Sequence, residues 1–536
     1  MHRSGLSLVL AWSALRYVSA ASPLDGPPIS SSGPSDNCRK TKVAILGAGT
    51  AGITAGQALA NQSIDDFVIV EYNGEIGGRV AHTTFGEDLD GKPYTVELGA
   101  NWVQGLVTGD GPENPIWTLA KKHNITYAYS NYSSLETFTD QGAVDYRSKI
   151  DDFEDAYSIV EQDAGQIMLQ NLQDRSFRAG LRLAGWNPKQ DFESQAVEWW
   201  EFDFEYTYPP DLNSQEYTIA NYNLTYYQFS EENNYVFDQR GFNTFLKDEA
   251  SSYLSENDPR LLLNTIVTNI TWSDSEVTIH NQDGTCIRAD YAICTFSLGV
   301  LQYDEVTFHP PLPDWKLTSL TAFEMGTYTK IFLQFPTNST PFWDTSTQFF
   351  LYADPNTRGY FPIWQSLDGP DFLPGSNILF VTVTHDQSYR VESQSDAQTQ
   401  ADVLAVLRSM YGAEAVPDPV AIMYPRWTTT PWAHGSYSNW PPATTLAMHQ
   451  DLRANVGRLW FAGEHTSAQY FGFLHGAWFE GREAGLAVAG CVVEGASTNC
   501  SERSVFEVLH GSTPLEEFEP GNGWVASSFQ TNGLEI

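Results

Sequence analysis

The sequence predicts an α/β fold that contains a parallel sheet, and three observations support this prediction. A largely apolar run at 42–46 leads into a glycine-rich turn at 47–52 and a helix-forming stretch at 51–59. A second apolar run follows at 67–70. Near the other end of the chain, a third apolar run leads into another glycine turn within 459–464. A strand, a helix and a strand in this order are typical of a βαβ unit, whose strands are parallel.

The first turn has the spacing of a dinucleotide-binding site. Gly47 permits a tight turn, Gly49 lets the backbone approach a pyrophosphate, and Gly52 lets the helix pack closely against the strand. Glu71 follows the second strand and is placed to accept a hydrogen bond from a ribose hydroxyl. A coincidental glycine turn is the alternative, but the strand before it, the helix after it and the acid favour a Rossmann-type domain.

The middle of the chain predicts a second domain with a mixed sheet and flanking helices. Residues 150–182 have the apolar spacing of helices, whereas short apolar runs in 259–300, 330–335 and 378–383 indicate strands. Residues 496–536 are polar and rich in glycine and serine, which predicts a mobile tail.

The composition limits the partners that we expect. The chain has 536 residues and a formal net charge of −37, so it should repel nucleic acids and anionic membranes. A cationic substrate would be steered inward by the same charge. An acidic surface that keeps an exported protein soluble explains the charge equally well.

The N-terminus predicts export from the cell. Residues 1–20 combine a short polar start, an apolar stretch and small residues at 18–20, as in a secretory signal peptide. A buried N-terminal helix is the alternative. Beyond this segment no apolar run reaches 18 residues, so we expect no membrane span and an extracellular protein. Glycosylation sequons support export and begin at Asn61, Asn124, Asn131, Asn223, Asn269, Asn338 and Asn499.

The cysteines indicate neither a disulfide scaffold nor a metal site. There are five of them, at Cys38, Cys286, Cys294, Cys491 and Cys500. Their spacing matches no metal-ligand pattern, so we expect no metal. Cys491 and Cys500 are close enough in sequence to close a small loop, which would leave Cys286 and Cys294 as buried thiols.

Further motifs carry a resemblance to a known family. A Gly-Gly-Arg turn at 77–79 follows the second strand directly, and residues 97–103 read Glu-Leu-Gly-Ala-Asn-Trp-Val. From about residue 41 to residue 495 the chain resembles the flavin-containing amine oxidases, in particular the polyamine oxidases of the secreted plant type. Three more segments follow in the family's order: 328–333, 437–441 and 461–466.

The resemblance implies FAD as the cofactor. Relatives that attach flavin covalently use a cysteine in the segment equivalent to 433–438, which contains none here, so we expect non-covalent FAD. Beyond the first glycine turn and Glu71, the resemblance assigns the following residues to the flavin site: Gly78, Arg79, Gly99, Ala100, Trp102, Val267, Trp427 and Glu464. It divides the chain into an FAD-binding domain (41–120, 230–330 and 431–495) and a substrate domain (121–229 and 331–430).

The resemblance also assigns catalytic roles. Lys330 would hold a water against flavin N5, and a lysine in an apolar strand is costly unless it is paired or catalytic. A lysine that extends its ammonium from an edge strand to solvent is the alternative. Tyr437 and Phe473 would face each other before the flavin and guide the amine, and Tyr328 would line the same cavity. Simple core packing is the alternative for these aromatic residues.

Two polar positions bear on the substrate. Glu205 matches the family's tunnel acid, which binds the distal ammonium groups of a polyamine; a solvated acid is the alternative. Plant relatives commonly have a second glutamate where this chain has Gln104. An amide accepts a hydrogen bond from an ammonium but supplies no charge, so the resemblance is weakest in the part of the site that selects the substrate.

The expected function is therefore that of an FAD-dependent polyamine oxidase. The amine would lose a hydride to flavin N5, and the resulting imine would hydrolyse to an aldehyde and a shorter amine. Dioxygen would reoxidise the flavin and give hydrogen peroxide. We expect a monomer with a small-molecule polyamine and dioxygen as its partners. The alternatives are an oxidase of another amine, such as an L-amino acid, and a flavin-fold binding protein without turnover.

Overall fold

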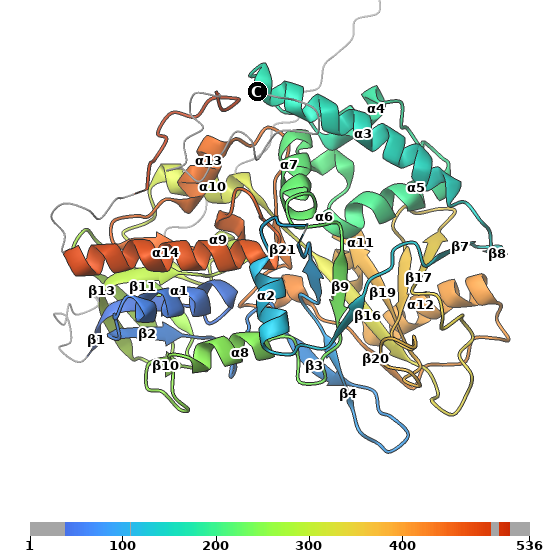
Figure 1. Cartoon of the computed structure of the whole chain (residues 1–536), viewed down its shortest axis with the longest axis horizontal. Helices are drawn as coiled ribbons and strands as arrows, with labels where there is room; N and C mark the ends of the chain where they lie inside the picture. The colour runs from blue at the N-terminus through green and yellow to red at the C-terminus, as the bar shows by residue number, and fades with distance from the viewer. Residues whose placement is uncertain (1–37, 108, 495–502, 515–536) are drawn as a thin grey trace, which may run out of the picture. The chain divides into compact units, whose positions relative to one another are not determined.

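The computed structural model describes residues 38–107, 109–494 and 503–514 (Figure 1). The predicted signal peptide, Asn499 and Cys500 lie outside the described residues, as do 495–502 and 515–536 of the C-terminal region. In the part of the chain that is described, no helix is long and apolar enough to cross a membrane.

An eight-stranded sheet brings the two ends of the sequence together. Its centre is β1 (Arg39–Leu46), which pairs in parallel with β2 (Phe67–Val70) on one side and β13 (Cys286–Cys294) on the other. The late strand β22 (Leu459–Phe461) pairs in parallel with β13. The four residues of β2 and all three of β22 are buried, as expected for parallel strands covered on both faces. The remaining strands are β10 (Leu261–Leu262), β11 (Val267–Trp272), β12 (Val277–Asn281) and β14 (Thr307–His309).

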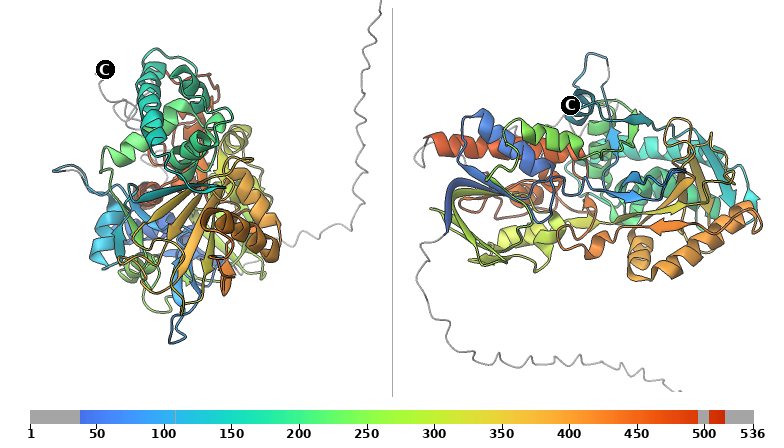
Figure 2. Two further views of the ribbon diagram at one scale, coloured as in Figure 1. Left: turned by 90° about the vertical axis from the view of Figure 1, so that its right-hand side faces the viewer. Right: turned by 90° about the horizontal axis from the view of Figure 1, so that it is seen from below.

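Two helices from opposite ends of the sequence pack against each other beside this sheet. They are α1 (Thr50–Asn61) and α14 (Leu474–Glu494), which lie side by side in Figure 1 and in the right view of Figure 2. Close approach is possible because α14 has glycines at the contact. A Cβ at Gly481 would lie 2.2 Å from the Ala51 carbonyl oxygen, and one at Gly485 would lie 2.7 Å from that of Ala55.

A seven-stranded mixed sheet forms the second large element, with helices on both faces. In β17, alternate side chains enter different cores: Phe349 packs with Phe153 and Trp199 from helices of one layer, whereas Phe350 packs with Leu407 from the other. In spatial order the strands are β20 (Ala421–Met423), β16 (Tyr328–Gln334), β19 (Ile378–Thr384), β18 (Ile363–Ser366), β17 (Phe349–Ala353), β7 (Leu135–Thr139) and β8 (Gly142–Ala143).

The first of these helical layers includes a π-helical segment, η1 (Trp199–Asp203), between two α-helices. The helices of the first layer are α3 (Ser148–Leu169), α4 (Phe177–Leu183), α5 (Phe192–Glu198), α6 (Phe204–Tyr206) and α7 (Gln215–Tyr226), and those beside the opposite face are α11 (His385–Ser393) and α12 (Asp396–Tyr411). The other helices are α2 (Pro115–Lys122), α8 (Thr244–Ser251), α9 (Leu298–Gln302), α10 (Asp314–Ala322) and α13 (Leu446–Arg453), with short 3-10 turns η2 (Pro210–Leu212), η3 (Trp427–Thr429) and η4 (Glu464–Thr466).

The remaining strands form smaller, separate sheets. The strands of these sheets are β3 (His82–Phe85) with β4 (Tyr94–Glu97), β5 (Trp102–Gln104) with β9 (Asn233–Val236) and β6 (Tyr127–Tyr129), and β15 (Glu324–Gly326) with β21 (Tyr437–Asn439). The α/β fold with a parallel sheet and a mixed sheet agrees with the prediction, while the limits of the two domains stay a prediction.

Two sequence-based expectations differ from the structure. Cys286 was expected as a buried thiol but is disulfide-bonded, whereas Cys294 is a buried free thiol. Spacing along the chain could not reveal this bond, because disulfide partners are selected by the fold. Part of the predicted tail also packs on α13: the Phe506 amide donates to Asp451 Oδ1 at 2.7 Å, and Arg503 donates to the Arg453 carbonyl at 2.9 Å.

Candidate functional site

A large cavity extends from the carboxyl ends of β1, β2 and β13 to the helical layer of the mixed sheet. Ligands bind at this end of parallel strands in α/β proteins. Of the residues predicted for the cofactor, Gly52 packs behind the cavity. The others line it: Gly47, Gly49, Glu71, Gly78, Arg79, Gly99, Ala100, Trp102, Val267, Trp427 and Glu464.

The glycine-rich turn forms a cradle of backbone amides at the start of α1. Gly49 is the N-cap of this helix and supplies no side-chain cap, so the first N–H groups remain available for an anion. The buried Thr50 hydroxyl has no hydrogen-bond partner in the described chain, and Thr50 lines the cavity. A Cβ on Gly52 would lie 1.9 Å from the Gly47 carbonyl oxygen, which explains the glycine there. These features fit a pyrophosphate.

Backbone amides hold the carboxylate of Glu71 in place just after the end of β2. Its Oε2 accepts from the Ala48 amide at 2.7 Å, and its Oε1 accepts from the Asn73 amide at 2.8 Å. Burial raises the pKa of Glu71 above its ordinary value, although these hydrogen bonds act in the opposite direction. A carboxylate held in this way fits the ribose hydroxyl of a dinucleotide.

An ion pair joins the early and late parts of the site. Arg79 Nη1 donates to Glu464 Oε1 at 2.8 Å and to the Ser436 carbonyl at 2.9 Å. Glu464 Oε2 accepts from the Ser438 hydroxyl at 2.6 Å and from the Gly472 amide at 2.8 Å. Burial alone would raise the pKa of Glu464, but Arg79 and the hydrogen bonds bring it below its ordinary value. The carboxylate therefore stays charged and organises three segments around the cavity.

Lys330 lies one layer behind the cavity wall, in the middle of the buried strand β16. Its Nζ donates to the Gly99 carbonyl at 2.7 Å and to Asn101 Oδ1 at 3.0 Å, and both acceptor residues line the cavity. Burial lowers the pKa of Lys330, whereas the negative charge of Glu97 acts to raise it. A lysine that reaches solvent is excluded because its side chain is enclosed here.

The aromatic residues predicted for the substrate side meet in the same cavity. Tyr437, Phe473 and Tyr328 all line it. The ring centroids of Tyr328 and Tyr437 are 6.3 Å apart with an interplanar angle of 42°. The Tyr437 hydroxyl donates to the backbone carbonyl of Glu205 at 2.7 Å, so this ring also fixes the neighbouring acid.

Glu205 and Gln104 form one hydrogen-bonded unit on the cavity wall. Gln104 Nε2 donates to Glu205 Oε1 at 3.0 Å, and the Tyr226 hydroxyl donates to the same oxygen at 3.2 Å. Burial raises the pKa of Glu205 to about 7, and the two hydrogen bonds partly oppose this rise. Both hydrogen bonds go to Oε1, and no residue of the described chain donates to Oε2, so the unit offers one carboxylate oxygen to a ligand.

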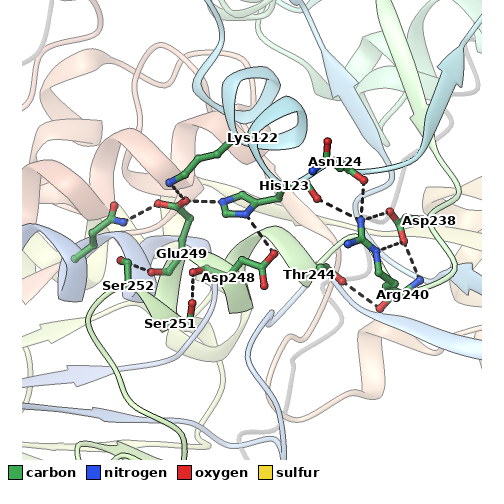
Figure 3. Close-up of polar contacts among 11 residues, drawn as sticks. Lys122, His123, Asn124, Asp238, Arg240, Thr244, Asp248, Glu249, Ser251 and Ser252 are labelled. Atoms are coloured by element: carbon green, nitrogen blue, oxygen red, sulfur yellow. Dashed lines mark hydrogen bonds and ion pairs between the residues drawn. The ribbon is translucent and has the colours of Figure 1, made fainter.

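The start of α2 holds the backbone of Gln104 in place. Asn114 caps α2, donates to the Gln104 carbonyl at 2.9 Å and lies 3.3 Å from His475 Nδ1. After the other end of α2, His123 Nε2 lies 2.6 Å from Glu249 Oε1 of α8, and Lys122 pairs with the same carboxylate (Figure 3). These contacts hold α2, and with it the main chain at Gln104, in place.

Sequence comparisons with known proteins agree with this geometry. The model of the flavin-containing amine oxidoreductases matches residues 50–488. The chain belongs to this family. It is 36% identical over 469 residues to polyamine oxidase 1 of Zea mays, covering 84% of this chain and 90% of that one. It is also 36% identical over 458 residues to polyamine oxidase 7 of Oryza sativa subsp. japonica, covering 82% and 93%.

Solved structures support the fold of this amine oxidase. A putrescine oxidase bound to putrescine superposes with a TM-score of 0.63 at 17% identity, covering 83% of this chain and 98% of that one. Family membership makes the protein an FAD-dependent amine oxidoreductase, and the amide cradle, Glu71 and the Arg79–Glu464 pair are the groups that would hold FAD. When bound, the flavin supplies the two-electron acceptor for amine oxidation.

Several residues of the site were missed at the sequence level. Tyr226 binds Glu205 and Asn101 binds Lys330, while Tyr132 and Asn221 also line the cavity. Asn101 could have been identified from the sequence, because it lies inside the motif 97–103 on which the resemblance rests. Tyr226 and Tyr132 had no such signal, since other tyrosines lie close to each of them in the sequence and only the fold selects which one reaches Glu205 or the cavity wall.

Proposed function

We propose that the protein is a polyamine oxidase that uses dioxygen. A substrate amine carrying a CH₂–NH bond, one dioxygen and one water would give an aldehyde, hydrogen peroxide and a shorter amine, or ammonia where the oxidised amine is primary. The C–H and N–H hydrogens leave with two electrons to form the imine, and water then divides it. The similarity to two plant polyamine oxidases supports this proposal. The observation that carries it is the carboxylate of Glu205 in the cavity that also contains the amide cradle.

The residues of this chain would share the work in three ways. Tyr437, Phe473 and Tyr328 would exclude water and align the reacting amine, whose lone pair must be free. Glu205 would bind an ammonium at the far end of the substrate. Lys330, whose pKa is lowered by burial, would hold and exchange a proton beside Gly99 and Asn101 of the cavity wall.

A peroxide assay tests this function. Purified enzyme should release peroxide with spermidine, spermine or putrescine, and should do so poorly with benzylamine and amino acids. Peroxide from amino acids alone would contradict the polyamine substrate. Absence of peroxide with every amine would favour a binding protein. The products of spermidine would identify the cleaved bond.

Lys330→Met tests the proposed proton carrier. Methionine preserves the volume of the side chain but removes the amine, so flavin reduction or reoxidation should slow by about 10²-fold or more. Stopped-flow absorbance of the flavin measures both steps, and the FAD content of the variant shows whether the site is intact. Unchanged rates in a fully loaded variant would remove the proposed role.

An L-amino acid oxidase is the nearest alternative function. Such a site needs a free cation for the substrate carboxylate. Among the described residues, Arg79 is the one arginine on the cavity wall, and it is bound to Glu464 and the Ser436 carbonyl. This arrangement favours a cationic substrate over an anionic one.

We also propose that the protein is secreted as a monomer with non-covalent FAD. The predicted signal peptide and the sequons support export. Asn61, Asn124 and Asn338 are exposed, whereas Asn223 is buried and donates to Glu161 at 3.0 Å, so we expect sugar on the first three and none on Asn223. Mass spectrometry of secreted protein, light scattering and release of flavin on denaturation check these points.

A further inference from the structure

The π-helical segment η1 stands directly before the proposed substrate acid. Its five residues, Trp199–Asp203, follow α5 and precede Glu205 by one residue. A π-turn is wider than an α-turn and is unfavourable by itself, so it persists where neighbouring groups stabilise it, and it is common at functional sites. The stabilising group must therefore be found among the contacts of this segment.

One guanidinium bridges the two ends of the π-turn. Arg358 Nε donates to Glu198 Oε1 at 3.1 Å, while its Nη1 and Nη2 donate to the two oxygens of Asp203 at 2.7 and 2.6 Å. Glu198 and Asp203 are 0% and 2% exposed. Among the described ion pairs Arg358 is the one cation at Asp203, whereas Glu198 is shared with Arg178, so the bridge favours the register that brings positions 198 and 203 to the same arginine.

The loop that carries Arg358 is itself fixed. It connects β17 to β18, and Asp354 Oδ1 accepts from the Asn356 and Thr357 amides at 2.9 and 2.8 Å. Gly359 has a φ of +74°, and a Cβ there would lie 2.9 Å from the Trp199 ring. The loop therefore packs directly on the π-turn and links it to the mixed sheet.

We propose that Arg358 is a positioning residue for substrate selection, which holds Glu205 at the cavity by bridging Glu198 and Asp203 across the π-turn. Arg358 lies outside the cavity lining and acts through the main chain, because Glu205 follows Asp203 by two residues. Gln104 and Tyr226 then donate hydrogen bonds to the carboxylate of Glu205, and the Tyr437 hydroxyl donates one to its backbone carbonyl. The inference rests on the proposed role of Glu205 as the ammonium partner.

A purely stabilising ion pair is the competing explanation, and matched variants separate the two. Arg178 also donates to Glu198 Oε2 and Oε1 and packs in the same network, but it pairs with Asp211 and not with Asp203. Arg358→Lys keeps a charge and loses the forked contact that spans the turn. Arg178→Lys makes the same chemical change at Glu198 but keeps the Arg358 contacts to Glu198 and Asp203 that span the π-turn.

The experiment measures KM and kcat for spermidine with FAD-loaded enzyme. Because the position of the distal anchor affects binding more than chemistry, Arg358→Lys should raise KM about tenfold and leave kcat within about twofold. Arg178→Lys should leave KM within about twofold. In a Glu205→Gln background, Arg358→Lys should add no further rise in KM, since the group it positions is gone.

Other results would overturn the inference. Equal effects of the two lysine variants, or a full additional rise of KM in the Glu205→Gln background, would assign Arg358 a general structural role. If Arg358→Lys does not fold, Asp203→Asn provides the same comparison, because it removes one anchor and keeps the side-chain shape. A normal KM in Glu205→Gln alone would instead refute the role of Glu205, which separates failure of the proposed function from failure of this inference.

Discussion

At the scale of single residues, the substrate side of the cavity combines the carboxyl group of Glu205 with two neutral hydrogen-bond donors, Gln104 and Tyr226. Gln104 stands where the resemblance to plant polyamine oxidases leads us to expect a glutamate, and it donates to Glu205 at 3.0 Å. A second carboxylate at this distance would compete with Glu205 for a proton, and one of the two would become strongly basic. Because position 104 is an amide, Glu205 titrates without a second carboxylate beside it at that position. We therefore expect the cavity to bind one distal ammonium, and chain length to affect affinity less than in a site with two acids.

The raised pKa of Glu205, about 7, predicts a pH dependence of substrate binding. Below this pH the acid is neutral and attracts an ammonium weakly; above it the carboxylate forms. KM for spermidine should therefore fall as the pH rises from about 6 to 8, by about tenfold. Steady-state kinetics across this range measure the change.

The control for this pH dependence is Glu205→Gln. Ionisation of the substrate amine also changes with pH, and it affects both enzymes. The difference between the two KM profiles isolates the side chain, and it should be small at pH 6 and large at pH 8. Parallel profiles would show that Glu205 does not titrate in the binding step.

At the scale of elements, local patterns predicted some parts of the site and could not predict others. The glycine turn and Glu71 were recognisable because a βαβ unit places all its functional groups within one short segment. The π-turn was not, since the segment around Trp199 has no signal for an extra residue per turn. Its ends are bridged by Arg358, which lies 155 residues after Asp203 in the sequence, so no local pattern indicates the contact.

The contact between α1 and α14 is a second case in which elements from distant parts of the sequence meet, and it can be tested by substitution. A Cβ at Gly481 would lie 2.2 Å from the Ala51 carbonyl and 2.3 Å from the Thr54 hydroxyl oxygen. Because the first obstacle is backbone, Gly481→Ala must push the helices apart, and we expect the free energy of unfolding to fall by about 1–3 kcal/mol. FAD retention should weaken as well, since α1 begins at the amide cradle.

Gly490→Ala is the matched control on the same helix. A Cβ there meets nothing within 4 Å, so the substitution should be neutral or stabilise the protein by about 0.4–1 kcal/mol through the unfolded state. Chemical denaturation of both variants, with flavin absorbance after desalting, compares them. Equal stability of Gly481→Ala and wild type would show that the two helices can separate without loss.

At the scale of the whole molecule, distant parts of the chain cooperate in one cavity. Arg79 and Glu464 form an ion pair, and β22 aligns with β13 beside β1. The substrate side is assembled in the same way, from β5, α6, β21 and the loop before α14. Neither half of the sequence contains a complete site, so loss of either end should remove both cofactor and substrate binding.

The net charge of −37 gives the last prediction, because it acts on the encounter with substrate and not on the chemistry. A polycationic amine should be attracted over a distance set by the Debye length, about 30 Å at 0.01 M salt and about 3 Å at 1 M. We expect kcat/KM for spermidine to fall about tenfold between these limits while kcat stays nearly constant. Glu205→Gln should show the same relative fall, since the field arises from the whole surface. A kcat/KM independent of salt would mean that the acidic surface serves solubility alone.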